Sequence, residues 1–312
     1  MKGEHDQMAN SRVYPEAKLT NQQSETSAWK DFLALIKIGI VNSNLITVFT
    51  GIWLAIVFTD AKFLERIDTV LYTLIGSGLI MAGSCVLNNF IDRDIDPLME
   101  RTKTRPTVTG KVKPAKVAVL GFSFLFIGTL FLLLTTITAT VIALIGAFSY
   151  VVVYTMWTKR RLVSNTVIGS FSGAFPPLIG WAAIDPGLHV IAWSLFLIMF
   201  VWQPPHFYSL AIRRAEEYRA AGIPMLPVVK GFEVAKRHTY LWIIALFPLP
   251  FLLYQIGIPF LILATLLNIG WVITGIRASK KQDEYKWATA MFIYSIQYLT
   301  ILFVSMVVFT LF

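Results

Sequence analysis

The apolar residues of this chain come in long blocks that are separated by short polar and charged segments. Most blocks are about 20 residues long, the length that an α-helix needs to cross the hydrocarbon core of a bilayer. The pattern predicts nine spans, at residues 33–58, 69–90, 117–136, 138–157, 163–184, 190–212, 239–256, 258–276 and 287–312. The sequence therefore predicts an all-α integral membrane protein.

Composition agrees with this pattern, because the 312 residues are 56% hydrophobic and only 14% charged. The third and fourth spans almost meet in the sequence, as do the seventh and eighth, so each pair should form a tight helical hairpin.

Residues 1–30 are polar and are expected to be a flexible cytoplasmic tail, with one polytopic membrane domain over residues 31–312. The tail lacks the apolar core of a signal peptide and contains acidic residues, unlike a mitochondrial transit peptide. A bacterial inner (cytoplasmic) membrane is therefore expected.

The positive charges predict the orientation of the spans. Of the 27 Lys and Arg residues, 24 fall in the tail and in alternate loops. The positive-inside rule then places the N-terminus in the cytoplasm and the C-terminus outside. The same loops would face an anionic membrane surface, which explains the net charge of +9 without a nucleic-acid partner. The single cysteine, Cys85, excludes an internal disulfide and a thiolate metal cluster.

An acidic segment follows the second span. On a helix, Asn88, Asp92 and Asp96 would recur every four residues and line one stripe, with Asp94 on another side. Carboxylate and amide oxygens are the ligands that Mg2+ prefers, with water and substrate phosphate in the other positions. The stripe is therefore a candidate metal site, and Asn88, Asp92 and Asp96 are candidate catalytic residues. The alternative is a solvated helix end before Pro97.

Basic residues lie near this stripe in the predicted topology. Arg101 and Arg105 follow it in the same loop, and Lys159 and Arg160 stand at the inner end of the fourth span. Guanidinium groups bind phosphate oxygens in a bidentate manner. Carboxylates and cations around one point would suit a Mg2+-diphosphate, so all four residues are candidate diphosphate ligands, with Lys159 also a candidate catalytic residue.

Polar residues also occur within the first span. Lys37 lies near its inner end, where the ammonium group could extend to the interface or face a cavity. Asn44 lies deeper and could reach a diphosphate or metal-bound water. The proline pairs Pro176-Pro177 and Pro204-Pro205 are expected to interrupt the helical hydrogen-bond ladder, so that the fifth and sixth spans bend around a cavity.

Three segments of the chain resemble the UbiA-type intramembrane prenyltransferases, and in particular their haem-modifying members. The first runs through Asn88-Asn89, Asp92-Arg93-Asp94, Asp96, Met99, Arg101-Thr102 and Arg105-Pro106 and resembles the first aspartate-rich motif of that family. The second contains Tyr154-Thr155, Lys159-Arg160, Asn165, Gly169, Gly173, Pro176-Pro177 and Gly180. The third runs from Pro205-His206-Phe207 through Glu217-Tyr218 to Pro227. The resemblance extends from about residue 31 to the C-terminus.

This resemblance implies a nine-helix bundle with a membrane-embedded, Mg2+-dependent active site and a cytoplasmic cap. It implies transfer of a farnesyl group from farnesyl diphosphate to the 2-vinyl group of haem B, with addition of water, to give haem O for terminal oxidases. Haem B is then a substrate and not a cofactor. A haem A synthase or oxidase assembly proteins are the implied protein partners.

One motif departs from the family pattern. The second aspartate-rich motif, DxxxD, has Arg213 at its first aspartate and Glu217 at its second. The resemblance implies Glu217 as a further metal ligand, and Arg213 or Arg214 as a partner for a haem propionate. His206 is a candidate haem-binding residue, because a neutral imidazole could coordinate the iron.

Two other functions fit parts of the sequence. A prenyltransferase with an aromatic acceptor, such as 4-hydroxybenzoate or a naphthoate, would share the acidic motif but would not explain His206. A membrane transporter could also place polar residues at proline breaks, yet transporters often have paired repeats and sites at the membrane midplane. Here the charged residues gather on one side of the membrane.

Overall fold

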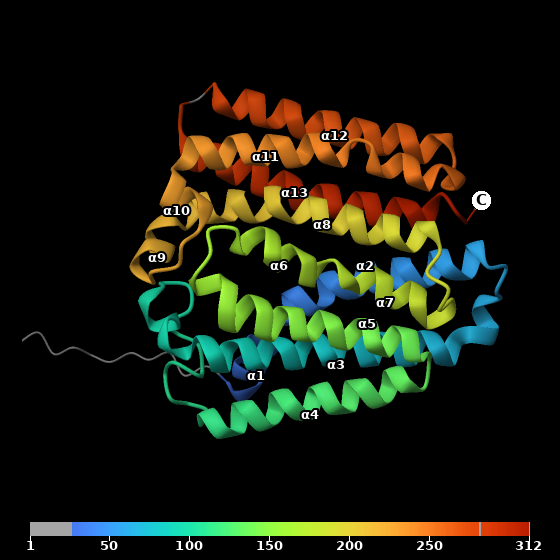
Figure 1. Ribbon diagram of the computed structural model, residues 1–312, viewed down its shortest axis with the longest axis horizontal. Helices are drawn as coiled ribbons and strands as arrows, with labels where there is room; N and C mark the ends of the chain where they lie inside the picture. The colour runs from blue at the N-terminus through green and yellow to red at the C-terminus, as the bar shows by residue number, and fades with distance from the viewer. Residues whose placement is uncertain (1–26, 281, 312) are drawn as a thin grey trace, which may run out of the picture.

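The computed structural model describes residues 27–280 and 282–311, and their regular structure is helical throughout (Figure 1). Most of the predicted tail, residues 1–30, lies outside these ranges. The described part begins with α1 (Ala28–Ile36), whose N-terminus is capped by Ser27. Lys37 then takes a left-handed conformation with φ 51°, which separates α1 from α2. The first predicted span is therefore two helices.

Nine helical segments in the described residues are long and apolar enough to cross a membrane, which confirms the predicted number. They are built from α2 (Ile38–Phe58), α3 (Ile67–Ile91), α4 (Pro114–Leu133), α5 (Ile137–Phe148) with the π-helix η4 (Ser149–Trp157), α6 (Asn165–Gly173) with α7 (Phe175–Ile184), α8 (Val190–Arg213), α11 (Phe232–Leu246) with η6 (Leu249–Ile256), α12 (Ile258–Ser279) and α13 (Glu284–Val308). Three residues join α4 to α5, and Gly257 joins η6 to α12, so both predicted hairpins are present.

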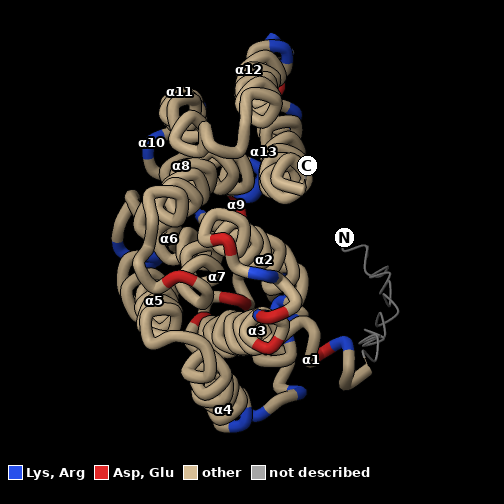
Figure 2. The backbone as a smooth tube through the Cα atoms, turned by 90° about the vertical axis from the view of Figure 1, so that its right-hand side faces the viewer, with Lys and Arg blue, Asp and Glu red and all other residues tan. Residues whose placement is uncertain are grey.

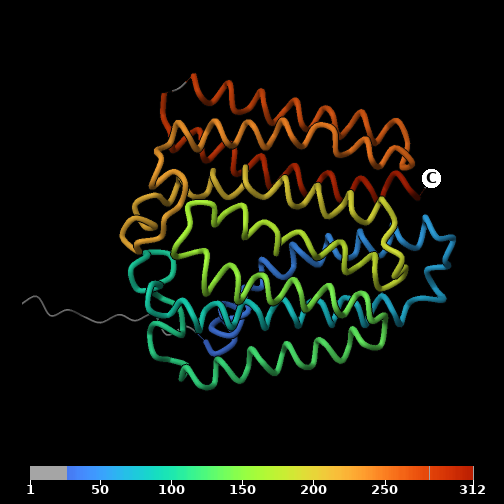
Figure 3. The backbone as a smooth tube through the Cα atoms, viewed as in Figure 1, coloured from blue at the N-terminus to red at the C-terminus, as the bar shows by residue number. Residues whose placement is uncertain are grey.

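The helices lie lengthwise beside one another, and the longest connections gather at one end of the bundle (Figure 3). We call this the loop end; it contains residues 92–113 and residues 214–231, which include α9 (Ala215–Ala220) and α10 (Leu226–Lys230). Seen from the opposite end, charged residues mark the ends of the helices and the connections between them (Figure 2). This distribution is what a membrane-spanning bundle requires.

Glycines allow the helices to approach closely. Gly180 of α7 lies against the backbone carbonyl of Val48 in α2, where a Cβ atom would overlap. A Cβ on Gly83 of α3 would lie 2.7 Å from the carbonyl oxygen of Gly121 in α4. Small residues at such crossings let helices pack by van der Waals contact, which is a main source of association within lipid. Packing against α4 thus holds α3, the helix that leads into the acidic segment.

The two proline pairs behave differently. The fifth span is interrupted at Ala174, just before Pro176-Pro177, as predicted. In the sixth span, α8 continues through Pro204-Pro205 to Arg213, so the bend predicted there does not end the helix. Side-chain bonds at this level support the helix: Gln203 Nε2 donates to the carbonyls of Met199, at 3.1 Å, and Ser170, at 3.0 Å. Tertiary packing therefore outweighs the local preference of proline.

Candidate active site

The acidic segment begins where α3 ends, at Ile91. Asp92 opens the short 3-10 helix η2 (Asp92–Asp94), and Asp96 opens a second one, η3 (Asp96–Leu98). The prediction of a continuous α-helical stripe is therefore wrong in its geometry. Pro97 explains the difference, since it disfavours α-helix at the residue before it. Both carboxylates are nevertheless buried, each with 1% of its surface exposed.

Asp92 is paired with cations from a distant part of the chain. Its Oδ2 atom lies 2.5 Å from Lys159 Nζ, and its Oδ1 atom lies 3.5 Å from Arg160 Nη2. Asn88 Nδ2 donates to Asp92 Oδ2 at 2.9 Å, and Asn88 Oδ1 accepts a hydrogen bond from Lys37 Nζ. A buried carboxylate requires such compensation. Lys37 therefore faces into the protein and not toward the lipid headgroups.

Asp96 has one satisfied and one free oxygen. Arg105 Nη1 lies 2.6 Å from Asp96 Oδ2, while Oδ1 is buried without a hydrogen-bond partner in the described residues. Thr102 Oγ1 donates to the backbone carbonyl of Asp96 at 2.7 Å and so fixes the loop that returns Arg105 to this carboxylate. A buried, unpaired carboxylate oxygen calls for a cation or a donor, which fits a metal ligand.

Asp94 has a different partner and a different setting. Its two oxygens bind Arg160 in a bidentate pair, at 2.6 and 2.7 Å, and 59% of its side chain is exposed. Arg160 Nη2 also donates to the carbonyl of Ile91 at 3.0 Å. This clamp joins the segment at the end of α3 to Arg160, which follows the π-helix η4. Sequence reasoning separated Asp94 from the stripe but missed this partner, which lies 66 residues away.

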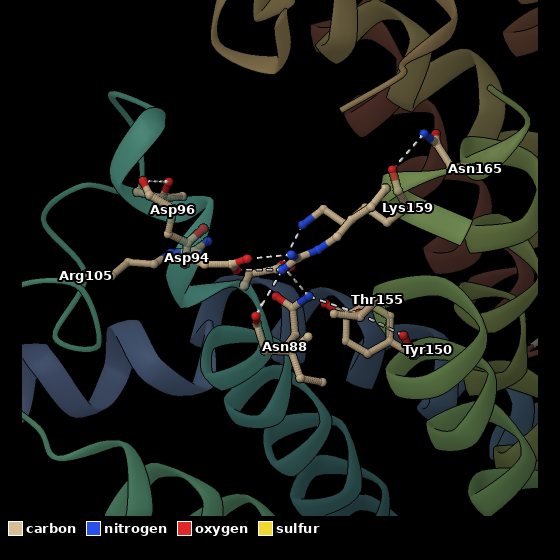
Figure 4. Close-up of polar contacts among 12 residues, drawn as sticks. Asn88, Asp94, Asp96, Arg105, Tyr150, Thr155, Lys159 and Asn165 are labelled. Carbon is tan, nitrogen blue, oxygen red and sulfur yellow. Dashed lines mark hydrogen bonds and ion pairs between the residues drawn. The ribbon is translucent and has the colours of Figure 1, made fainter. Parts of the chain in front are cut away.

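The π-helix η4 supplies the opposite wall of the site. Thr155 Oγ1 accepts from Asn88 Nδ2 at 3.0 Å and donates to the Tyr150 carbonyl at 2.8 Å. Its wider turns lead into η5 (Thr158–Arg160), which presents Lys159 and Arg160 to the carboxylates. Such π-helical segments occur often at functional sites. Figure 4 shows Asn88, Thr155 and Lys159 approaching one another from these two parts of the chain.

The second long loop packs onto the first. Glu217 Oε1 lies 2.6 Å from Arg214 Nη1, and Glu217 Oε2 accepts from the backbone N–H of Arg101 at 3.3 Å. A hydrophobic cluster of Ile95, Met99, Ala211, Ala221, Ile223 and Met225, with Tyr218 beside it, lies under this contact. Burial raises the pKa of the Tyr218 phenol, which therefore stays neutral. Arg214 and Glu217 thus pair with each other across one turn.

The remaining predicted residues lie elsewhere. His206 stacks between Trp202 and Phe292, with each ring centroid 4.8 Å away, and Arg213 lies over the Phe292 ring at 4.8 Å. Two of the three predicted haem-binding residues therefore meet at Phe292 of α13, and Arg214 is not among their contacts. Asn44 is partly exposed on α2, and its Nδ2 atom donates to the carbonyl of Ile40 at 2.8 Å. Its assignment to the diphosphate stays a prediction.

A polar hollow of about 440 Å³ lies at the opposite end of the bundle. It is lined by Thr59, Asp60, Ala61, Lys62, Glu65, Arg66, Ile184 and Asp185. None of the predicted site residues lines it. The buried carboxylates and their cations at the loop end therefore remain the candidate active site.

Nine candidate membrane spans in the described residues, with buried carboxylates and their cations at the loop end, define an intramembrane protein with a charged site at one end of the bundle. Residues 44–296 match the UbiA prenyltransferase family, and this chain belongs to that family. Two solved structures share the fold. One is described as digeranylgeranylglyceryl phosphate synthase, with a TM-score of 0.67 and 21% identity over 90% of this chain and 98% of that one. The other is a UbiA homologue from Archaeoglobus fulgidus bound to GPP and Mg2+, with a TM-score of 0.61 and 16% identity over 89% and 99%.

Several bacterial proteins are much more similar to this chain in sequence than the two solved structures are. Protoheme IX farnesyltransferase 2 of Bacillus velezensis is 59% identical over 305 residues, which cover 98% of this chain and 100% of that protein. The protein of the same name from Bacillus subtilis has the same identity and coverage. Protoheme IX farnesyltransferase of Bacillus licheniformis is 58% identical over 98% of this chain and 99% of that one. The family predicted from the motifs is therefore confirmed.

Proposed function

We propose that this chain transfers a farnesyl group from farnesyl diphosphate to the 2-vinyl group of haem B, with addition of water, to form haem O. The observation that carries the proposal is 59% identity to protoheme IX farnesyltransferases over nearly the whole of both chains. Asp92, which is buried, also pairs with the predicted Lys159, and Asp96 is buried four residues further along the same segment, which supports a common site.

Mg2+ is the proposed cofactor, held by Asp92 and Asp96 with the amide oxygen of Asn88, and with Glu217 as a further candidate ligand. The unpaired Oδ1 of Asp96 supports this choice, because hard cations take carboxylate oxygens. The Archaeoglobus fulgidus homologue was determined with GPP and Mg2+, which supports the same pairing of ligands here. When bound, Mg2+ supplies electrostatic stabilisation of the charge that develops on the departing diphosphate.

The chain's own cations are proposed to bind the diphosphate. Lys159 lies 2.5 Å from Asp92 and Arg105 lies 2.6 Å from Asp96, which supports a role for both cations beside the proposed metal ligands. Arg101 and Arg160 border the same cluster and are proposed as further phosphate ligands, with Asn44 from α2. Positioned cations stabilise the leaving group without reorganisation at the moment of reaction. Burial of the carboxylates keeps bulk water away from the diphosphate site. An allylic cation formed there is therefore protected from water until the vinyl carbon captures it.

Haem B is proposed to be bound by His206, with Arg213 or Arg214 near a propionate. Arg213 lies over the Phe292 ring that stacks on His206, so a positive charge suited to a haem propionate lies near the imidazole. We further propose that the loop end faces the cytoplasm of a bacterial inner membrane, with the N-terminus inside and the C-terminus outside. A haem A synthase or oxidase assembly proteins are proposed to receive the product.

Acceptor competition tests this function. Purified protein is incubated with labelled farnesyl diphosphate and Mg2+, and with haem B, 4-hydroxybenzoate or both. We expect label in the haem fraction, and we expect 4-hydroxybenzoate neither to take the label nor to slow the transfer. Label in the benzoate would assign an aromatic acceptor. No consumption of farnesyl diphosphate with either acceptor would favour a transporter.

A further inference from the structure

Ser295 lies on α13 at its contact with α8 and is completely buried. It receives two side chains that are one turn apart on α8. Trp202 Nε1 donates to the Ser295 carbonyl at 2.9 Å, and His206 Nδ1 lies 2.7 Å from Ser295 Oγ. One residue of α13 therefore fixes both neighbouring rings, which stack on each other at 4.8 Å.

The hydrogen bonds of Ser295 determine where the imidazole proton lies. Ser295 Oγ donates to the carbonyl of Phe292 at 2.6 Å. A hydroxyl group has one hydrogen, so this bond leaves Oγ only its lone pairs. The 2.7 Å contact with His206 must then be donated by Nδ1–H. A neutral imidazole carries one N–H, and its other nitrogen, Nε2, therefore holds the lone pair.

The surroundings of His206 fix the direction of that lone pair. Trp202 covers one face of the ring and Phe292 the other, each at 4.8 Å and close to parallel, with interplanar angles of 22° and 28°. With both faces covered, only the edge of the imidazole is left for a ligand, and the side chain is partly exposed. Arg213 lies over the same Phe292 ring, at 4.8 Å from its centroid.

We propose that Ser295 is a positioning residue that holds His206 in the Nδ1–H tautomer, and that Nε2 is the atom that His206 presents to the haem iron. A histidine that ligates a metal usually donates its other N–H to an oxygen, which sets the tautomer and the ring orientation. The hydroxyl of Ser295 has this role for His206. The ligand assignment rests on the proposed haem substrate, whereas the tautomer does not.

Nitrogen NMR of protein labelled with 15N-histidine tests the tautomer without any substrate. The protein has four histidines, and loss of signals in His206→Ala identifies those of His206. We expect the Nδ1–H tautomer in the parent and in Ser295→Thr, which keeps the hydroxyl, and a mixture of tautomers in Ser295→Ala. Ser305→Ala is the matched control, because Ser305 is also buried on α13 but its hydroxyl bonds only the Leu302 carbonyl among the described residues, at 2.8 Å. A parent protein with the Nε2–H tautomer would overturn the proposal.

Spectroscopic titration with ferric haem B, in the absence of farnesyl diphosphate, tests the ligand. We expect a histidine-ligated Soret spectrum in the parent, Ser295→Thr and Ser305→Ala, and its loss in His206→Ala. Ser295→Ala should weaken haem binding by about tenfold, as changes to such supporting groups do. A spectrum that His206→Ala leaves unchanged would overturn the iron assignment. Absence of haem binding in the parent, with the tautomer as expected, would instead contradict the proposed function.

Discussion

The three aspartates of the acidic segment differ in burial and in partners, and so should differ in function. Asp92 and Asp96 are each 1% exposed and are paired with Lys159 and Arg105, whereas Asp94 is largely exposed and bound to Arg160. The structure therefore separates two candidate metal ligands from one residue that joins two helix ends.

Asparagine substitutions test this difference. We expect Asp92→Asn and Asp96→Asn to lower haem O formation by about 100-fold or more, because each removes an anionic ligand from the leaving-group site. Asp94→Asn should lower it by about fivefold or less, since a pair this exposed contributes about 1 kcal/mol or less. Initial rates at saturating Mg2+ provide the comparison. Equal loss of activity in all three variants would contradict the separate roles.

Diphosphate binding can be measured apart from turnover. We expect Arg105→Ala and Lys159→Ala to weaken inhibition by inorganic diphosphate by about tenfold, because each loses a charged hydrogen bond to phosphate. Lys113→Ala is the matched control: Lys113 is an exposed cation of the same loop, just before α4. Arg105→Lys and Lys159→Arg keep the charge beside each carboxylate and check that folding is intact. Unchanged inhibition of both alanine variants would remove these residues from the phosphate site.

The two long loops are held together by specific contacts between elements. Glu217 in α9 binds Arg214 and the backbone N–H of Arg101, and so connects the start of the second loop to the residues after η3. Its side chain is 17% exposed, in contrast to the 71% of Glu216 beside it. This carboxylate is therefore placed to fix the first loop, whether or not it also contributes to a metal site.

Limited trypsin digestion tests the contact between the loops. We expect Glu217→Gln to speed cleavage after Arg101 and Lys103 several-fold, because the loop loses its ion-paired anchor. Glu216→Gln removes an equivalent i,i+3 pair with Arg219 at the surface and should leave cleavage unchanged. If cleavage stays slow in Glu217→Gln while the Mg2+ requirement rises, Glu217 is a metal ligand and not an anchor of the loop.

At the scale of the whole molecule, the sequence predicts those structural features that depend on local composition and charge. The nine spans follow from the length of the apolar blocks, and the meeting of Asp92 with Lys159 follows from placing both at the inner ends of spans. The Asp94–Arg160 clamp and the His206–Ser295 bond could not be predicted, because their partners lie 66 and 89 residues apart and follow no spacing rule. The continuity of α8 through Pro204-Pro205 likewise depends on its neighbours.

The most direct test of the whole account is the mass of the haem after reaction. Purified protein is incubated with haem B, farnesyl diphosphate and Mg2+, and the extracted haem is analysed by mass spectrometry, with the Asp96→Asn variant as control. The account predicts that the parent converts haem B into a product heavier by one farnesyl group and one hydroxyl group, and that Asp96→Asn does not. Unmodified haem from the folded parent, or equal product from Asp96→Asn, would contradict it.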